Sequence, residues 1–186
     1  MGRITLITGG ARSGKSAFAE SLLEGRDAVL YVATAVGFDE EMRERIALHR
    51  SRRNPAWETL ECRRGFAEIL PWKIGGRDRI LFDCVTLMVS NMMVIDSAID
   101  WDDADRSAVA ALGRDVMDEV KGLLKIFRDF SGETVVVTNE LGMGIVPGTP
   151  LGRHYRDFAG SANQLIAAES DRVIFVVSGI PVTIKG

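Results

Sequence analysis

Short apolar runs alternate with longer segments of helical pattern along most of this chain. The runs that predict strands are Ile4–Thr8, Ala28–Thr34, Trp57–Glu61, Arg79–Cys84, Thr134–Asn139 and Arg172–Ser178. Several of them are apolar without alternation, which is typical of strands covered on both faces of a parallel sheet. The pattern predicts an α/β fold with a mostly parallel sheet and helices on both faces, and Pro181–Lys185 is expected to add an antiparallel edge strand.

The longest helix is predicted after the acidic cluster at 102–105, since carboxylates favour a helix N-terminus. Its apolar residues recur at spacings of three and four, and they are Val109, Leu112, Val116, Val120, Leu123 and Phe127. We expect this stripe to be core and not a cofactor site. Gly132 is expected to end the helical segment. The 186 residues carry no repeat or linker, so a single domain over 1–186 is predicted.

Composition and charge narrow the classes of partner. A net charge of -3 gives no general attraction to nucleic acid, and a small anionic ligand fits it better. The most apolar stretch, Val85–Ile95, is too short and too polar to cross a membrane. The two cysteines have no C-x-x-C or metal-ligand spacing, and no signal peptide precedes the first predicted strand. We therefore expect a cytoplasmic protein without a membrane span and without a nucleic-acid partner.

A phosphate-binding loop is predicted between the first strand and the first helix. Its residues are Gly9, Gly10, Ala11, Arg12, Ser13, Gly14, Lys15 and Ser16. Gly9 and Gly14 permit the backbone conformations that aim several N–H groups at a triphosphate. Lys15 is expected to bring its charge to the β- and γ-phosphates, and Ser16 is expected to offer a hydroxyl to Mg²⁺.

Ligands of an open parallel sheet bind beyond the carboxyl ends of its strands. The polar or small residues at these ends are Thr34, Ala35, Glu61, Asp83, Asn139 and Glu140. Asp83 ends a hydrophobic strand, which makes it a candidate Mg²⁺ ligand with Ser16. The alternative is that Asp83 caps the helix predicted from Val85.

The residues after the fifth predicted strand leave two alternatives open. Asn139 and Glu140 resemble the start of a guanine-reading GTPase motif, but the lysine and aspartate of that motif are missing, so a switch GTPase is not expected. The loop that follows contains Gly142, Gly144, Pro147, Gly148 and Pro150. It is either a lid that contacts the ligand or a plain connector.

The segment 40–53 is predicted to form a helix with one histidine among many cations. Its arginines nearest to His49 are Arg43, Arg45, Arg50, Arg52 and Arg53. These cations suit a polyphosphate and its leaving group. A neutral imidazole there is a candidate nucleophile toward phosphorus, and a surface or capping role is the alternative. His154, between Arg153 and Arg156, has similar neighbours, so the residues alone do not decide between the two histidines.

Longer strings of this sequence resemble one known family. They are Thr8–Ser16, Tyr31–Thr34, Arg45–His49, Trp57–Glu61, Val137–Pro147 and Val177–Ile180. These strings are similar to those of the bifunctional adenosylcobinamide kinase/adenosylcobinamide-phosphate guanylyltransferases of cobalamin synthesis. With the phosphate-binding loop, the resemblance implies a P-loop NTPase-like fold of the RecA type. One departure is the fourth predicted strand, which ends in Asp83 where the family has glutamate.

The resemblance also implies a reaction and a set of site residues. ATP or GTP would phosphorylate adenosylcobinamide, and GMP from GTP would then pass through a GMP-histidine to adenosylcobinamide phosphate. The family's R-I-x-x-H pattern places the nucleophile at His49. The implied nucleotide pocket contains Thr34, Ala35, Arg50, Arg53, Glu61 and Asp83. A homotrimer that binds the corrinoid is also implied, and a monofunctional P-loop small-molecule kinase is the alternative function.

Overall fold

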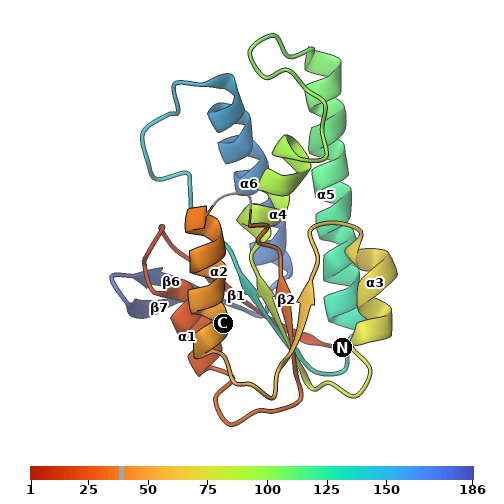
Figure 1. The fold of residues 1–186 in the computed structure, drawn as a ribbon, viewed down its shortest axis with the longest axis vertical. Coiled ribbons are helices and arrows are strands. Elements are labelled where there is room, and N and C mark those ends of the chain that lie inside the picture. Colours follow the sequence, from red (N-terminus) through yellow and green to blue (C-terminus); the bar gives the residue numbers. More distant parts are fainter. Residues whose placement is uncertain (38–39) are drawn as a thin grey trace.

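Seven strands form one sheet through the middle of the described residues (Figure 1). The computed structural model describes residues 1–37 and 40–186. The strands are β1 (Arg3–Thr8), β2 (Val29–Ala33), β3 (Glu58–Glu61), β4 (Arg79–Asp83), β5 (Glu133–Val137), β6 (Arg172–Val177) and β7 (Ile180–Lys185). The helices are α1 (Lys15–Ser21), α2 (Glu40–Arg52), α3 (Phe66–Lys73), α4 (Val85–Val94), α5 (Arg106–Asp129) and α6 (Pro150–Glu169). Each predicted strand is confirmed to within two residues at either end.

The strands lie in the order β3-β2-β4-β5-β1-β6-β7. Every neighbouring pair is parallel except β6 and β7, which are antiparallel. The predicted mostly parallel sheet and its antiparallel edge strand are therefore confirmed. Because the sheet is parallel, β1, β2, β4 and β5 all end at the same edge, and the loops that follow them meet there.

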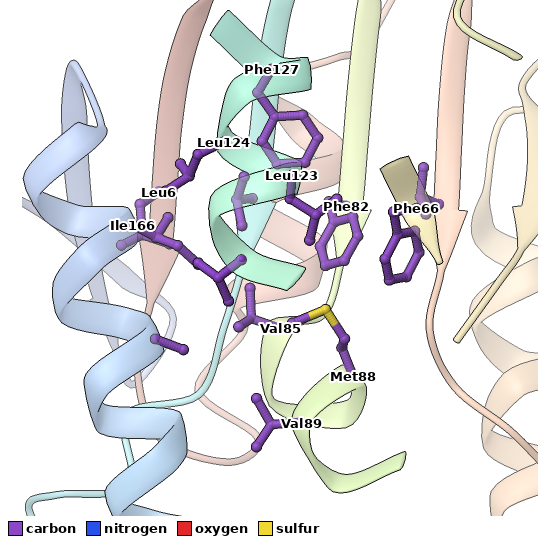
Figure 2. Packing of buried hydrophobic residues seen from close by; sticks show 14 of the residues in the cluster. Leu6, Phe66, Phe82, Val85, Met88, Val89, Leu123, Leu124, Phe127 and Ile166 are labelled. Atoms are coloured by element: carbon purple, nitrogen blue, oxygen red, sulfur yellow. The ribbon is translucent and has the colours of Figure 1, made fainter. Parts of the chain in front are cut away.

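Two hydrophobic clusters cover the two faces of the sheet, which confirms helices on both sides. The larger cluster joins one face to α3, α4, α5 and α6, and the smaller joins the other face to α1. Figure 2 shows Phe82 of β4 in the larger cluster, between Phe66 of α3 and Phe127 of α5. The Phe82 ring lies edge-on to both, with centroid distances of 5.2 Å to Phe66 and 6.0 Å to Phe127. Such edge-to-face pairs add to the stabilisation from burial.

Helix α5 has the predicted core stripe, because all six residues of that stripe are buried. Its N-cap is Asp105, whose carboxylate accepts a hydrogen bond from the N–H of Ala108. The prediction for Gly132 is wrong, since α5 ends at Asp129 and Phe130 is its C-cap in an extended conformation. The structure gives another reason for this glycine, because a Cβ there would lie 2.1 Å from the backbone oxygen of Asp78.

Helix α2 differs from the other helices in its exposure. None of its side chains whose burial the structure describes is buried, whereas every other helix contributes buried residues. In Figure 1 it stands apart from α3 and α5. Among the described residues, no helix combines the length and the apolar character needed to cross a bilayer.

Candidate functional site

The residues between β1 and α1 form a tight loop whose backbone requires glycine at two positions. Gly14 is the N-cap of α1 and has a left-handed φ of 94°. At Gly9, a Cβ would lie 2.3 Å from the backbone oxygen of Val176. Arg12 also has a left-handed φ, of 57°. These conformations match those expected of a loop that directs its N–H groups toward phosphates.

Buried polar groups of this loop suit an anionic ligand. Lys15 is buried, and its Nζ donates a hydrogen bond of 2.8 Å to the backbone oxygen of Gly10. The hydroxyls of Thr8 and Ser13 are buried with no hydrogen-bond partner in residues 1–37 and 40–186. A buried hydroxyl without a hydrogen-bond partner lowers the stability of a protein. Phosphate oxygens bound in the loop would give these two hydroxyls partners. The loop therefore fits the nucleotide phosphates that its sequence predicts.

Two backbone donors from other parts of the sheet hold the carbonyl groups of the loop. The N–H of Glu140 donates to the oxygen of Gly9 at 2.9 Å, and the N–H of Gly179 donates to the oxygen of Ser13 at 2.9 Å. Carbonyl oxygens repel phosphates, so binding them elsewhere leaves the N–H groups to face the ligand.

Reasoning from the sequence missed the hydrogen bond from Gly179 to Ser13. Ser178 and Gly179 form the two-residue turn between β6 and β7, and both have left-handed φ values, of 52° and 81°. A Ser-Gly pair between two strand-like runs is a hairpin signal, so the turn itself was available from the sequence. Its contact with the loop was not, because it depends on β6 pairing with β1.

Thr34 connects β2 to the start of α4. Its hydroxyl donates to the oxygen of Cys84 and accepts from the N–H of Cys84, both at 2.8 Å. Its backbone N–H donates to the oxygen of Asp83, and its backbone oxygen accepts from Asn91. The polar groups of Thr34 thus fix the positions of Asp83 and Cys84, which are joined by a cis peptide bond. Contact of Thr34 or Ala35 with a nucleotide stays a prediction.

Asp83 ends β4 with its carboxylate hydrogen-bonded to Tyr31. The Tyr31 hydroxyl donates to Asp83 Oδ2 at 2.8 Å. Burial, together with the neighbouring Asp83 carboxylate, raises the pKa of Tyr31 above its usual range, so the phenol stays protonated and remains the donor. The N-cap of α4 is Cys84, without a side-chain hydrogen bond. The alternative role of Asp83 as a helix cap is therefore wrong.

Arg50, near the end of α2, and Arg53, just after it, contact side chains of β3 and β2. The guanidinium carbon of Arg53 lies 3.4 Å from the centre of the Tyr31 ring. Arg50 forms an ion pair of 3.2 Å with Glu61, and both side chains are exposed. The structure thus brings Arg53, Tyr31 and Asp83 together in one group and Arg50 and Glu61 in a second. The side chains of Arg45 and Arg52 lie outside the described part of the chain.

The two histidines have different surroundings. His49 is half-buried in α2, one residue before Arg50. His154 lies in α6 between aromatic rings, with centroid distances of 5.8 Å to Trp101 and 6.1 Å to Phe158. Aromatic packing accounts for His154, whereas His49 lies on α2, four residues before Arg53, which contacts Tyr31.

Mg²⁺ was expected at Ser16 and Asp83. No group of three or more His, Cys, Asp or Glu side chains that suits a metal occurs in the residues that the structure describes. Mg²⁺ that is bound with a nucleotide needs few protein ligands, because phosphates and waters supply the rest. A carboxylate at the end of β4 and a hydroxyl at the start of α1 suit such an ion.

Comparison with known proteins identifies the family of this chain. The model of the family described as cobinamide kinase / cobinamide phosphate guanyltransferase matches residues 5–184. The chain belongs to this family. The bifunctional adenosylcobalamin biosynthesis protein CobU of Salmonella typhimurium is 43% identical over 97% of this chain and 98% of its own length. CobU of Escherichia coli is 42% identical over the same shares, and CobP of Pseudomonas aeruginosa is 40% identical over 97% of this chain and 96% of its own.

Among solved structures, a KaiC-like protein of Pyrococcus horikoshii covers 93% of this chain and 70% of its own, with a TM-score of 0.49 and 13% identity. Membership of the family confirms the resemblance found in the sequence, and it makes this chain a member of a family of enzymes of adenosylcobalamin biosynthesis.

Proposed function

We propose that this protein carries out two successive reactions on a corrinoid, with nucleotides bound at the 9–16 loop. First, ATP or GTP gives its γ-phosphoryl group to the aminopropanol hydroxyl of adenosylcobinamide. Then GTP gives GMP to His49, and the GMP passes to adenosylcobinamide phosphate to yield adenosylcobinamide-GDP. The observation that carries the proposal is the braced loop with its buried Lys15, because both reactions begin with a bound triphosphate.

In the kinase step, the loop holds the triphosphate and leaves its γ-phosphorus open to the acceptor. Lys15 and the N–H groups of the loop stabilise negative charge on the phosphate oxygens. Ser16 and Asp83 are the proposed ligands of Mg²⁺, which adds charge neutralisation when bound. The acceptor oxygen forms the new P–O bond as the bond from γ-phosphorus to the bridging oxygen breaks, and the hydroxyl proton passes to solvent.

In the transfer step, an imidazole nitrogen of His49 attacks the α-phosphorus of GTP and pyrophosphate leaves. A phosphate oxygen of adenosylcobinamide phosphate then attacks the same phosphorus, the P–N bond breaks, and His49 is restored. Arg50 and Arg53 are the proposed cations for the departing pyrophosphate, because both follow His49 within four positions. Glu61, which pairs with Arg50, is proposed to orient that arginine.

The remaining expectations are part of the same proposal. We infer that the enzyme acts in the cytoplasm, as a homotrimer whose subunits share active sites, and without nucleic acid. The family resemblance supports the trimer. The net charge of -3 supports a small anionic ligand over a nucleic-acid polymer.

A covalent adduct tests the proposal directly. The protein is incubated with Mg²⁺ and GTP labelled at the α-phosphorus, and mass spectrometry then locates the added GMP. Label on wild-type protein that survives base, is lost in acid and disappears in His49→Asn is expected. His154→Asn is the matched control and should label like wild type, since His154 packs against Trp101 and Phe158.

Two results contradict the transfer step. One is wild-type protein that stays unlabelled, and the other is His49→Asn that labels normally. Full overall turnover by His49→Asn would favour the monofunctional kinase, which needs Lys15, Ser16 and Asp83 but no histidine.

A further inference from the structure

The loop between β5 and α6 exposes large apolar side chains close together. Met143, Ile145 and Val146 are 78%, 97% and 65% exposed. We call residues 142–149 the β5–α6 loop. Contact of apolar surface with water is unfavourable, and neighbouring exposed apolar residues mark surfaces that bind a ligand or a partner. Figure 1 shows this loop extending away from the sheet before the chain enters α6.

The backbone of the β5–α6 loop is held at both ends by hydrogen bonds. At its start, Glu140 Oε1 accepts from the N–H of Gly142 at 2.7 Å, and Arg156 donates to the oxygen of Gly142 at 2.6 Å. At its end, Arg153 donates to the oxygens of Pro147 and Gly148, at 3.2 Å and 2.9 Å. The apolar side chains are thus displayed by a loop whose ends are fixed.

Two glycines of the β5–α6 loop, Gly144 and Gly148, are not explained by the fold. A Cβ at Gly144 or Gly148 would meet nothing within 4 Å, and neither residue has a left-handed φ. Glycine costs conformational entropy in folding, so a position that needs neither its φ nor its small size is better filled by alanine. A ligand that lies directly against the exposed backbone gives such a position a reason for glycine.

The β5–α6 loop begins two residues after a contact with the phosphate-binding loop. Glu140, two residues before Gly142, donates its N–H to the oxygen of Gly9. A corrinoid whose aminopropanol hydroxyl reaches a γ-phosphate bound at the 9–16 loop can place its ring beside this part of the molecule. The corrin ring has apolar methyl groups and a rim of carboxamides. Exposed apolar side chains suit the methyl groups, and exposed glycine N–H and C=O groups suit the carboxamides.

We propose that the β5–α6 loop binds the corrin ring of adenosylcobinamide, with Met143, Ile145 and Val146 against its apolar surface and the backbone at Gly144 and Gly148 against its carboxamides. This inference rests on the proposed function. It assigns the acceptor a site that is separate from the residues that hold the nucleotide.

Equilibrium binding of adenosylcobinamide to the full-length protein without nucleotide tests the proposal. Ile145→Ser and Gly144→Ala should each raise its Kd about tenfold, while the affinity for MgATP stays unchanged. The matched controls are Ile184→Ser, an exposed isoleucine of β7, and Gly75→Ala, where a Cβ also meets nothing within 4 Å. Both controls should bind adenosylcobinamide like wild type. Gly144→Ala is the sharper variant, because the free energy of unfolding should not fall.

Two results overturn the proposal. One is unchanged affinity for adenosylcobinamide in both loop variants. The other is a loss of self-association by Ile145→Ser in sedimentation velocity, which would make the loop a contact between copies of the chain. Failure of wild-type protein to phosphorylate adenosylcobinamide would instead refute the proposed function. The Kd values for adenosylcobinamide would still test whether the loop binds the corrin ring.

Discussion

Tyr31 of β2 holds the carboxylate of Asp83 at the end of β4 through a hydrogen bond of 2.8 Å to Oδ2. The same phenol ring lies under the guanidinium of Arg53, at 3.4 Å. Tyr31 therefore joins the proposed Mg²⁺ ligand to the end of the helix that carries His49. A carboxylate with one oxygen held in this way has its other oxygen directed for a metal.

Tyr31→Phe should weaken Mg²⁺ binding while keeping the buried ring. Loss of a partner that orients a metal ligand typically costs about 10- to 100-fold in metal affinity. The Mg²⁺ dependence of the kinase rate and electron paramagnetic resonance of bound Mn²⁺ with nucleotide both measure this. The matched control is Tyr155→Phe, which removes a hydroxyl bonded to the backbone oxygen of Thr86. Equal metal affinity in wild type and Tyr31→Phe would argue against the role of this hydrogen bond.

Lys15→Ala should impair both half-reactions, because each begins with a triphosphate in the same loop. A hydrogen bond to a charged group contributes about 1.5–3 kcal/mol, so the Kd for ATP and for GTP should rise about 10- to 100-fold. Calorimetric titration with each nucleotide gives the measurement. Lys121→Ala, which removes an exposed lysine paired with Asp118 on α5, is the control. A variant that loses only one activity would contradict a shared loop.

Arg50→Ala and Arg53→Ala should slow guanylylation of His49 more than the kinase step. Their charges follow His49 in sequence and are proposed to stabilise the departing pyrophosphate. Single-turnover rates of adduct formation and of adenosylcobinamide phosphorylation give the comparison. Arg64→Ala, an exposed arginine near Asp115, serves as control. Equal losses in both steps would reject this division of roles.

Two glycines, one inside α5 and one shortly after it, should respond in opposite directions to alanine. At Gly122, inside α5, a new Cβ meets only Ala67 at 3.8 Å, so Gly122→Ala should stabilise the protein by about 0.5–1 kcal/mol through helix propensity. At Gly132 the Cβ would lie 2.1 Å from the Asp78 oxygen, so Gly132→Ala should destabilise by more than about 1 kcal/mol. Chemical denaturation measures both. A stabilising Gly132→Ala would disprove the close approach.

Asp171 should make stability depend on pH in the acid range. Its carboxylate accepts from the N–H of Ile4 and from Arg128, both at 2.8 Å, and the Ile4 hydrogen bond is the main cause of its lowered pKa. A lowered folded pKa stabilises the native state above the unfolded value of about 3.9, and the gain is lost as pH falls through the folded pKa.

Asp171→Asn should therefore lower the free energy of unfolding at pH 7 by about 0.5–1 kcal/mol, since solvent screens this partly exposed group. The difference from wild type should shrink as the pH falls below about 4. Urea denaturation at several pH values measures it. A difference that stays constant down to pH 2 would show that the charge of Asp171 is not responsible.

The middle of the sheet was predictable because β2, β4 and β5 contain continuous apolar runs, and their burial leaves few alternatives. Helix α2 was also located correctly, from Glu40 to Arg52, although none of its described side chains is buried. Rules based on neighbouring residues were less successful where tertiary contacts determine the role of a residue. Gly132 is required by the approach of Asp78, and Asp83 binds Tyr31 instead of capping α4.

The candidate site was predictable where chemistry is local in sequence. The 9–16 loop has its signature in eight consecutive residues, so its backbone conformation followed from the motif. The stacking of Arg53 on Tyr31 and the brace from Gly179 to Ser13 join distant segments. Such pairs depend on the order of the strands in the sheet, which the hydrophobic pattern of the sequence does not predict. Family membership supports the bifunctional activity as a whole, while the individual roles of His49, Arg50 and Asp83 stay predictions.

The hydrogen bond from the N–H of Gly179 to the oxygen of Ser13 bears on when the phosphate-binding loop can fold during synthesis. The signature residues emerge from the ribosome early, but the turn that steadies them emerges only after β6 has been made. A nascent chain that stops before that turn has the loop sequence without its support. Nucleotide should therefore protect a chain that is truncated before Gly179 from proteolysis less than it protects the full-length chain.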